Sequence, residues 1–133
     1  MQTSNLENSL VSFGLPIFNG APYLSRCLHS LIAQDYLNIE VIIRDDQSND
    51  ESLEICRSII GNDQRFKLSQ NRQRLGAHDN FLKTLSYARG EFFVWASQDD
   101  WWLPDFCSCL VSRLKANDRA IVAMSAVECF SPD

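Results

Sequence analysis

The chain has 133 residues, 45% of them hydrophobic and 22% charged, which fits one compact domain with a core of its own. Its net charge of −5 argues against a nucleic-acid partner, because such a partner requires a basic face. No apolar run approaches the roughly 18 residues of a membrane-spanning helix, and the polar residues 1–9 predict a flexible lead-in without a signal peptide.

The first predicted unit is a strand followed by a helix. Residues 10–15 form an apolar run that Pro16 ends, and residues 18–20 have the composition of a turn. Pro22 suits a helix start, because its fixed φ costs nothing in the first turn. Apolar residues then recur at helical spacing, so we predict a helix from 22 to about 34.

The second unit has the same order. Residues 39–43 are rich in β-branched side chains and predict a strand, which is followed by the carboxylates Asp45 and Asp46. Residues 48–50 are all suitable N-caps for a second helix, which Gly61 closes.

Two further strands and two helices follow. Residues 65–69 predict a short third strand, and the helix after it carries Phe81 and ends at Gly90. Residues 91–96 predict a strand with apolar side chains on both faces, which is typical of a strand covered by helices above and below. Pro104 opens the next helix, and residues 120–127 predict a final strand.

This β-α-β-α-β-α-β-α-β order predicts an α/β fold, a Rossmann-like three-layer α/β/α sandwich with a mainly parallel sheet. Right-handed crossovers follow by default. We expect a single domain over residues 10–133. The five cysteines include no C-x-x-C pair, which is typical of reduced thiols in a cytoplasmic protein.

Two acidic pairs follow strands, Asp45-Asp46 and Asp99-Asp100. Ligands of open α/β sheets bind at the carboxyl edge of the strands, so both pairs should lie at one site. Asp99-Asp100 is suited to Mg²⁺ or Mn²⁺, which take oxygen ligands and keep substrate phosphates in their shell. Two simpler interpretations stay open: Asp45-Asp46 caps the following helix, and Asp99-Asp100 belongs to a turn.

Neither common nucleotide motif occurs. The sequence has no G-x-G-x-x-G after its first strand and no G-x-x-x-x-G-K-[ST] anywhere, which argues against a dehydrogenase and a P-loop enzyme. A metal held by carboxylates would then replace the glycine-rich cradle, which points to a nucleotide-diphosphate leaving group.

The motifs taken together resemble glycosyltransferase family 2 with the GT-A fold. Residues 11–19 are similar to its V-S-I-x-x-P-T-Y-N opening, and Asp45 to Asp50 to its D-D-G-S-T-D. Residues 71–92 resemble its N-x-G…R-N…A-x-G-E-Y run, and residues 95–100 stand where the family keeps a D-x-D-type metal motif. Ile17 and Gln47 depart from the pattern, and the two aspartates are adjacent.

The resemblance implies the donor half of an inverting, metal-dependent transferase of polysaccharide biosynthesis. Its donor would be a UDP- or dTDP-sugar, and its cofactor Mn²⁺ or Mg²⁺. The residues that correspond to nucleotide-sugar contacts are Pro16, Phe18, Asp46, Asn80 and Asp99, and Asp100 would ligate the metal. Of these, Asn80 is a weaker candidate, for a diphosphate contact, as is Arg74, and a helix cap or a solvated surface position stays open for both. His78 is left out of the site, and Trp101 and Trp102 are expected to be buried.

The resemblance also implies an acceptor-binding half with a general base, which this chain lacks up to Asp133. The acceptor therefore stays unknown, and peripheral membrane association of a full-length enzyme and homodimerisation stay open. One alternative is a truncated, catalytically inactive nucleotide-binding or dimerisation module. Another is a receiver-like signalling domain, which should carry its acidic pair after the first strand.

Overall fold

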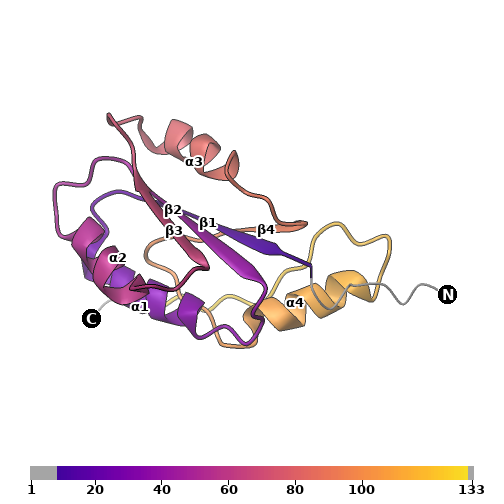
Figure 1. Cartoon of the computed structure of the whole chain (residues 1–133). Coiled ribbons are helices and arrows are strands. Elements are labelled where there is room, and N and C mark those ends of the chain that lie inside the picture. Colours follow the sequence, from indigo (N-terminus) through magenta and orange to yellow (C-terminus); the bar gives the residue numbers. More distant parts are fainter. Residues whose placement is uncertain (1–8, 132–133) are drawn as a thin grey trace.

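The computed structural model describes residues 9–131, which form four strands and four helices in alternation (Figure 1). The strands are β1 (Val11–Ile17), β2 (Ile39–Asp45), β3 (Phe66–Gln70) and β4 (Phe92–Trp95). The helices are α1 (Ala21–Ile32), α2 (Ser52–Ile60), α3 (Ala77–Leu85) and α4 (Phe106–Lys115). All strand pairs are parallel, in the order β3-β2-β1-β4, so the predicted α/β fold with a mainly parallel sheet is confirmed.

Helices cover both faces of the sheet. Figure 1 shows α3 on one face and α1, α2 and α4 on the other. The main core lies on the three-helix side, where Phe13 and Leu15 of β1 are fully buried together with Leu28 of α1. Trp102 meets Phe13 edge-on, with ring centroids 6.2 Å apart. The predicted three-layer arrangement is therefore present.

The strand order also decides against a receiver-like domain. Flavodoxin-like sheets, which receiver domains share, run 2-1-3-4-5, whereas here β1 lies between β2 and β4 and β3 is at the edge. The observed order matches the first four strands of the Rossmann arrangement instead.

Strand β4 has the predicted apolar residues on both faces. Phe93 and Trp95 point to the α3 side, where their rings meet edge-on at 4.7 Å and Trp95 packs against Phe81 at 4.9 Å. On the other face Phe92 packs against the main core. Gly14 of β1 makes room for these rings, because a Cβ at that position would lie 2.6 Å from the Phe93 ring.

The predicted final strand over residues 120–127 is wrong. No strand follows α4 within the described residues, and the apolar side chains of this segment face solvent: Ile121 is 92% exposed and Met124 84%. Apolar and β-branched residues favour a strand only where a neighbouring strand or core covers them, and among residues 9–131 nothing pairs with this segment.

The third helix ends earlier than predicted. Helix α3 stops at Leu85, and Gly90 lies beyond it against the start of β1. A Cβ on Gly90 would lie 2.7 Å from both the Leu10 carbonyl oxygen and the Ser12 amide nitrogen. Gly90 is therefore required for a close approach of two backbones and does not cap the helix.

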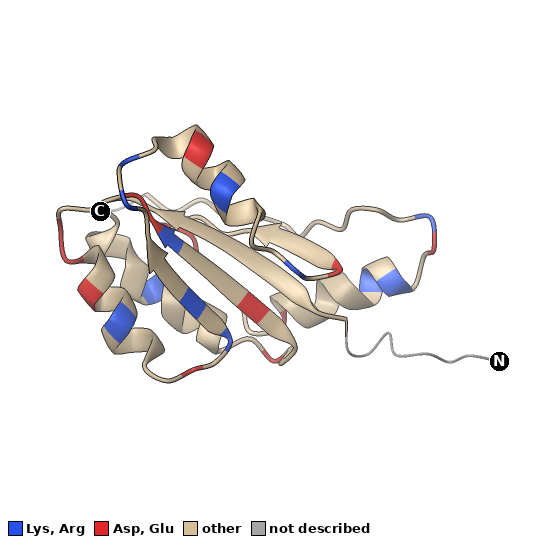
Figure 2. Cartoon of the chain, turned by 45° about the horizontal axis from the view of Figure 1, so that its top comes forward, with Lys and Arg blue, Asp and Glu red and all other residues tan. Residues whose placement is uncertain are grey.

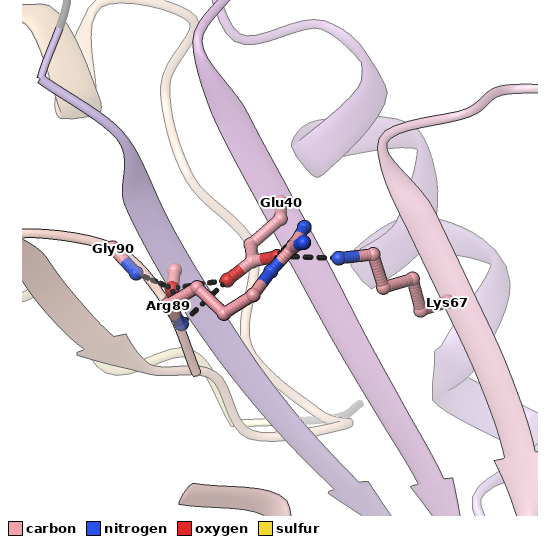
Figure 3. Close-up of polar contacts among 5 residues, drawn as sticks. Glu40, Lys67, Arg89 and Gly90 are labelled. Atoms are coloured by element: carbon pink, nitrogen blue, oxygen red, sulfur yellow. Dashed lines mark hydrogen bonds and ion pairs between the residues drawn. The ribbon is translucent and has the colours of Figure 1, made fainter. Parts of the chain in front are cut away.

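A buried carboxylate joins the strands at the end of the sheet opposite the predicted site (Figure 3). Glu40 of β2 is 3% exposed and accepts hydrogen bonds from Ser12 Oγ (2.7 Å) and the Arg89 amide (2.8 Å). Lys67 Nζ lies 2.6 Å and Arg89 Nη2 2.9 Å from its Oε2. Burial raises the pKa of Glu40, but these hydrogen bonds outweigh it and lower the pKa to about 2.

Three remaining predictions concern the chain as a whole. Of the predicted lead-in, residues 1–8 lie outside the described residues, while Ser9 is buried and accepts a 2.6 Å hydrogen bond from the Tyr36 hydroxyl. All five cysteines are free thiols, as predicted. No helix in the described part of the chain is long and apolar enough to cross a membrane.

Candidate functional site

The carboxyl ends of β1, β2 and β4 meet at one edge of the sheet, where the following loops and the start of α3 enclose a pocket of about 310 Å³. This is the edge at which open parallel sheets bind ligands. The lining residues are Pro16, Ile17, Phe18, Asp46, Arg74, Ala77, Asn80, Phe81, Ser97, Gln98 and Asp99.

Five of the six predicted site residues line this pocket, namely Pro16, Phe18, Asp46, Asn80 and Asp99. They come from three strand ends and one helix that are far apart in sequence. Asp100, the predicted metal ligand, is the next residue along the chain but does not line the pocket. Arg74, the weaker candidate, does line it.

Asp46 fixes the loop that leads into α3. It is 2% exposed, and its Oδ1 accepts hydrogen bonds from the Leu75 amide (2.7 Å) and Asn71 Nδ2 (2.9 Å). Its Oδ2 accepts one from the Gly76 amide (2.8 Å). Burial raises the pKa of Asp46, but the hydrogen bonds outweigh it and the net shift is downward, so the group is ionised at neutral pH. Asp46 therefore does not cap α2.

Asp45 and Gln47, the residues on either side of Asp46, form part of the turn before α2. Asp45 Oδ2 accepts hydrogen bonds from the Ser48 amide (3.0 Å) and from Gln70 Nε2 (2.9 Å), so Asp45 stabilises the turn before α2 and does not cap that helix. Gln47 has a φ of 62°, in the left-handed region that glycine adopts most easily. Its side-chain amide donates to the Asn71 carbonyl. Gln47 therefore has a backbone conformation typical of glycine, and its side chain makes a contact that glycine could not make.

Gln98 joins the loop after β4 to the loop after β1, a role that the sequence analysis missed. Its Oε1 accepts from the Phe18 amide (3.1 Å), and its Nε2 donates to the Phe18 carbonyl (3.2 Å). Gly20 leaves the space for this side chain, because a Cβ there would lie 2.5 Å from Gln98 Oε1. The two residues are 78 positions apart (98 − 20), and no sequence pattern links them.

Arg74 and Asn80 form two further sides of the pocket. The Arg74 guanidinium lies 3.9 Å above the centre of the Phe18 ring, a cation–π contact that holds a positive charge at the pocket. Asn80 is 3% exposed, accepts from Asn71 Nδ2 (2.8 Å) and donates to the Arg44 carbonyl (3.0 Å). Asn80 therefore stabilises the pocket wall and is neither the cap of α3 nor part of a solvated surface.

The two carboxylates after β4 are exposed to solvent. Ser97 Oγ donates to Asp99, and partial burial together with the neighbouring Asp99 charge raises the pKa of Asp100. Among the described residues no three His, Cys, Asp or Glu side chains converge into a complete metal site. The chain offers two oxygen ligands, a set that suits Mg²⁺ or Mn²⁺, because these ions take their remaining ligands from water and substrate phosphates.

The aromatic and histidine residues beside the site have structural contacts. Trp102 packs into the core against Phe13, as expected, and Trp101 lies under the Arg26 guanidinium at 4.1 Å. His78 is exposed and pairs with Asp79, which agrees with leaving it out of the site.

The sequence model of the family described as Glycosyl transferase family 2 matches residues 12–133. The chain belongs to this family. It is 41% identical over 124 residues to EpsH of Bacillus subtilis (strain 168), a protein named as a glycosyltransferase, and the match covers 92% of the chain and 36% of EpsH. The chain thus spans little more than a third of the length of EpsH and of a second relative, the glycosyltransferase GlyG of Streptococcus pneumoniae, of which it covers 38% at 30% identity.

Solved structures of glycosyltransferases share the fold. S. aureus TarS 1–349 in complex with UDP-GlcNAc superposes with a TM-score of 0.74 at 25% identity, over 81% of this chain and 31% of TarS 1–349. The mannosyltransferase PcManGT from Pyrobaculum calidifontis, in complex with GDP-Man and Mn²⁺, gives a TM-score of 0.71 at 24% identity, over 80% of this chain and 32% of that one. The GT-A fold that the sequence predicted is therefore confirmed.

Proposed function

We propose that this chain is the donor-binding part of an inverting, metal-dependent glycosyltransferase and binds a nucleotide-diphosphate sugar in the 310 Å³ pocket. The observation that carries the proposal is the convergence of Pro16, Phe18, Asp46, Asn80 and Asp99 on one pocket at the carboxyl edge of the sheet. Membership of glycosyltransferase family 2 and the UDP-GlcNAc held by TarS support it. The family match does not favour an inactive module.

Each side of the pocket suits one part of the nucleotide. Asp46 already accepts three hydrogen bonds, and a carboxylate has about four acceptor positions, so one remains for an N–H of the base. The Phe18 ring and the Arg74 guanidinium stacked on it offer a flat surface and a positive charge. Asp99, an exposed residue that lines the same pocket, can accept hydrogen bonds from ribose hydroxyls.

Asp100, together with Asp99, would hold the divalent ion, Mn²⁺ or Mg²⁺. When bound, the ion acts as a Lewis acid that neutralises charge on the departing diphosphate. Mn²⁺ is held by PcManGT, a protein of the same fold. We assign no residue of this chain as the general base.

Calorimetric titration of UDP and of dTDP, each with Mn²⁺ and with EDTA, tests the proposal. We expect saturable binding that requires the metal and that Asp100→Ala weakens by at least about tenfold, as the loss of one charged ligand implies. Asp118→Ala, which removes an exposed carboxylate elsewhere, is the matched control and should bind like the unmodified chain. Binding that ignores both metal and Asp100, or no binding by the folded chain, would refute the proposal.

A further inference from the structure

A second hollow lies on the α3 side of the sheet, next to the nucleotide pocket but sharing no lining residue with it. Its volume is about 430 Å³, and its lining residues are Arg44, Gln70, Arg72, Gln73, Leu75, Lys83 and Tyr87. The loop before α3 forms the wall between the two spaces, because Arg72 and Leu75 line the hollow while Arg74 lines the pocket. Three lining residues are cationic and none is acidic.

Arg44 is the central group of this hollow. It is 6% exposed and stacks on the Tyr87 ring at 4.8 Å, and within residues 9–131 it donates to two neutral acceptors, Ser69 Oγ (3.1 Å) and Asn71 Oδ1 (2.6 Å). Its Nε is buried and has no hydrogen-bond partner in the described part of the chain. No carboxylate within residues 9–131 forms an ion pair with it. A buried guanidinium without a counter-charge is costly, and a bound anion removes that cost.

The other two cations lack a counter-charge as well. Neither Arg72, on the loop, nor Lys83, on α3, forms an ion pair with any residue that the structure describes. Figure 2 shows blue segments on the loop before α3, on α3 and near the end of a strand, and a red segment on α3. Two carboxylates lie beside the hollow and are held by other donors: Asp45 Oδ2 accepts from Gln70 Nε2 (2.9 Å) and from the Ser48 amide, and Asp46 is turned toward the Leu75 and Gly76 amides.

We propose that this hollow is a binding site for a phosphate group, free in solution or carried by a lipid headgroup. Three cations match the double charge of a phosphate better than the single charge of a carboxylate, and the buried guanidinium offers a pre-oriented donor. Tyr87 and Asn71 hold that guanidinium in place.

The same contacts connect the hollow to the nucleotide pocket. Asn71 accepts from Arg44 Nη2 and donates to Asp46 Oδ1, so one amide bridges the two sites. Leu75 lines the hollow, and its backbone amide donates to Asp46. A phosphate bound at Arg44 is therefore linked through Asn71 to Asp46, the residue that holds the loop before α3.

Calorimetric titration of inorganic phosphate into the 133-residue chain, at constant ionic strength in chloride, tests the site. We expect one saturable site for phosphate and none for acetate. The double variant Arg72→Gln/Lys83→Gln keeps the buried Arg44 and should weaken phosphate binding by about tenfold or more, because it removes two charged donors. Arg57→Gln, which removes an exposed charge from α2 on the opposite face, should leave it unchanged.

Two further arms locate the site and its ligand. Arg74→Gln changes the nucleotide pocket alone, so phosphate affinity should survive it. Co-sedimentation with vesicles that contain phosphatidic acid, and not with pure phosphatidylcholine vesicles, would identify the lipid as the source of the phosphate. The proposal is overturned if the folded chain binds neither inorganic phosphate nor these vesicles, or if Arg74→Gln abolishes phosphate binding while the double variant retains it.

Discussion

Glu40 gives the most quantitative prediction for the fold, because one buried carboxylate joins Ser12, Lys67 and Arg89 from three parts of the chain. Its pKa falls from an ordinary value of 4.5 to about 2. One pKa unit corresponds to about 1.36 kcal/mol, so the ionised carboxylate stabilises the fold by about 3 kcal/mol at pH 7. This is an upper value, because the Lys67 and Arg89 side chains are 45% and 67% exposed and solvent screens them.

The sign of the pH dependence follows from the lowered pKa. The contribution of Glu40 is complete above the unfolded-state pKa of 4.5 and is lost as the pH falls toward 2. At pH 3 about 1 kcal/mol remains by the same linkage relation. Glu40→Gln keeps the shape but removes the charge, so we expect it to destabilise the chain by up to about 3 kcal/mol at pH 7 and by up to about 1 kcal/mol at pH 3.

Urea unfolding at both pH values, followed by far-ultraviolet circular dichroism, measures these free energies. Glu54→Gln, on the exposed face of α2, is the matched control and should change stability by less than about 0.5 kcal/mol at either pH. An equal effect of Glu40→Gln at pH 7 and pH 3, or an effect below about 0.5 kcal/mol at pH 7, would refute the reasoning.

Three other substitutions have definite expected outcomes. Gly90→Ala should cost about 1–3 kcal/mol in urea unfolding, because the new methyl group meets the β1 backbone at 2.7 Å; an unchanged midpoint would contradict this. Gln98→Ala removes both hydrogen bonds to Phe18 and should weaken UDP binding roughly tenfold in calorimetry, with little loss of stability. An unchanged affinity for UDP would show that the link between the two loops does not support the pocket. Asp46→Asn should lower stability by about 2 kcal/mol, since its amide would face backbone amides, and a neutral effect would contradict that geometry.

The fold was predictable where local pattern decides structure. Strand β2 is buried along its whole length, and the run of β-branched residues in its sequence predicts such a buried strand. The acidic pairs after β2 and β4 lie at one edge because parallel strands present their carboxyl ends on the same side, which follows from the β-α alternation.

The partners of polar side chains were not predictable. Asp46 accepts hydrogen bonds from amides 29 and 30 residues away, and Gln98 pairs with a backbone 80 residues away. Such pairs depend on how the loops meet in space, and an isolated sequence gives only a capping or turn preference for these residue types. The hollow around Arg44 was missed for the same reason, because its three cations come from β2, a loop and α3.

The predicted final strand failed for a different reason. Residues 120–127 have strand propensity, but propensity reflects packing against neighbours, and the described residues provide none for this segment. Gly90 likewise resembled a helix stop, whereas its position is set by contact with β1.

The most direct test of the central claim is an NMR titration of the isotope-labelled chain with UDP and Mg²⁺, followed by substitution of paramagnetic Mn²⁺. We expect UDP to shift the amides of Phe18, Gly76 and Gln98, and Mn²⁺ to broaden those of Asp99 and Asp100. Shifts confined to the hollow around Arg44, or no shifts at all in a folded chain, would contradict a nucleotide site at this edge of the sheet.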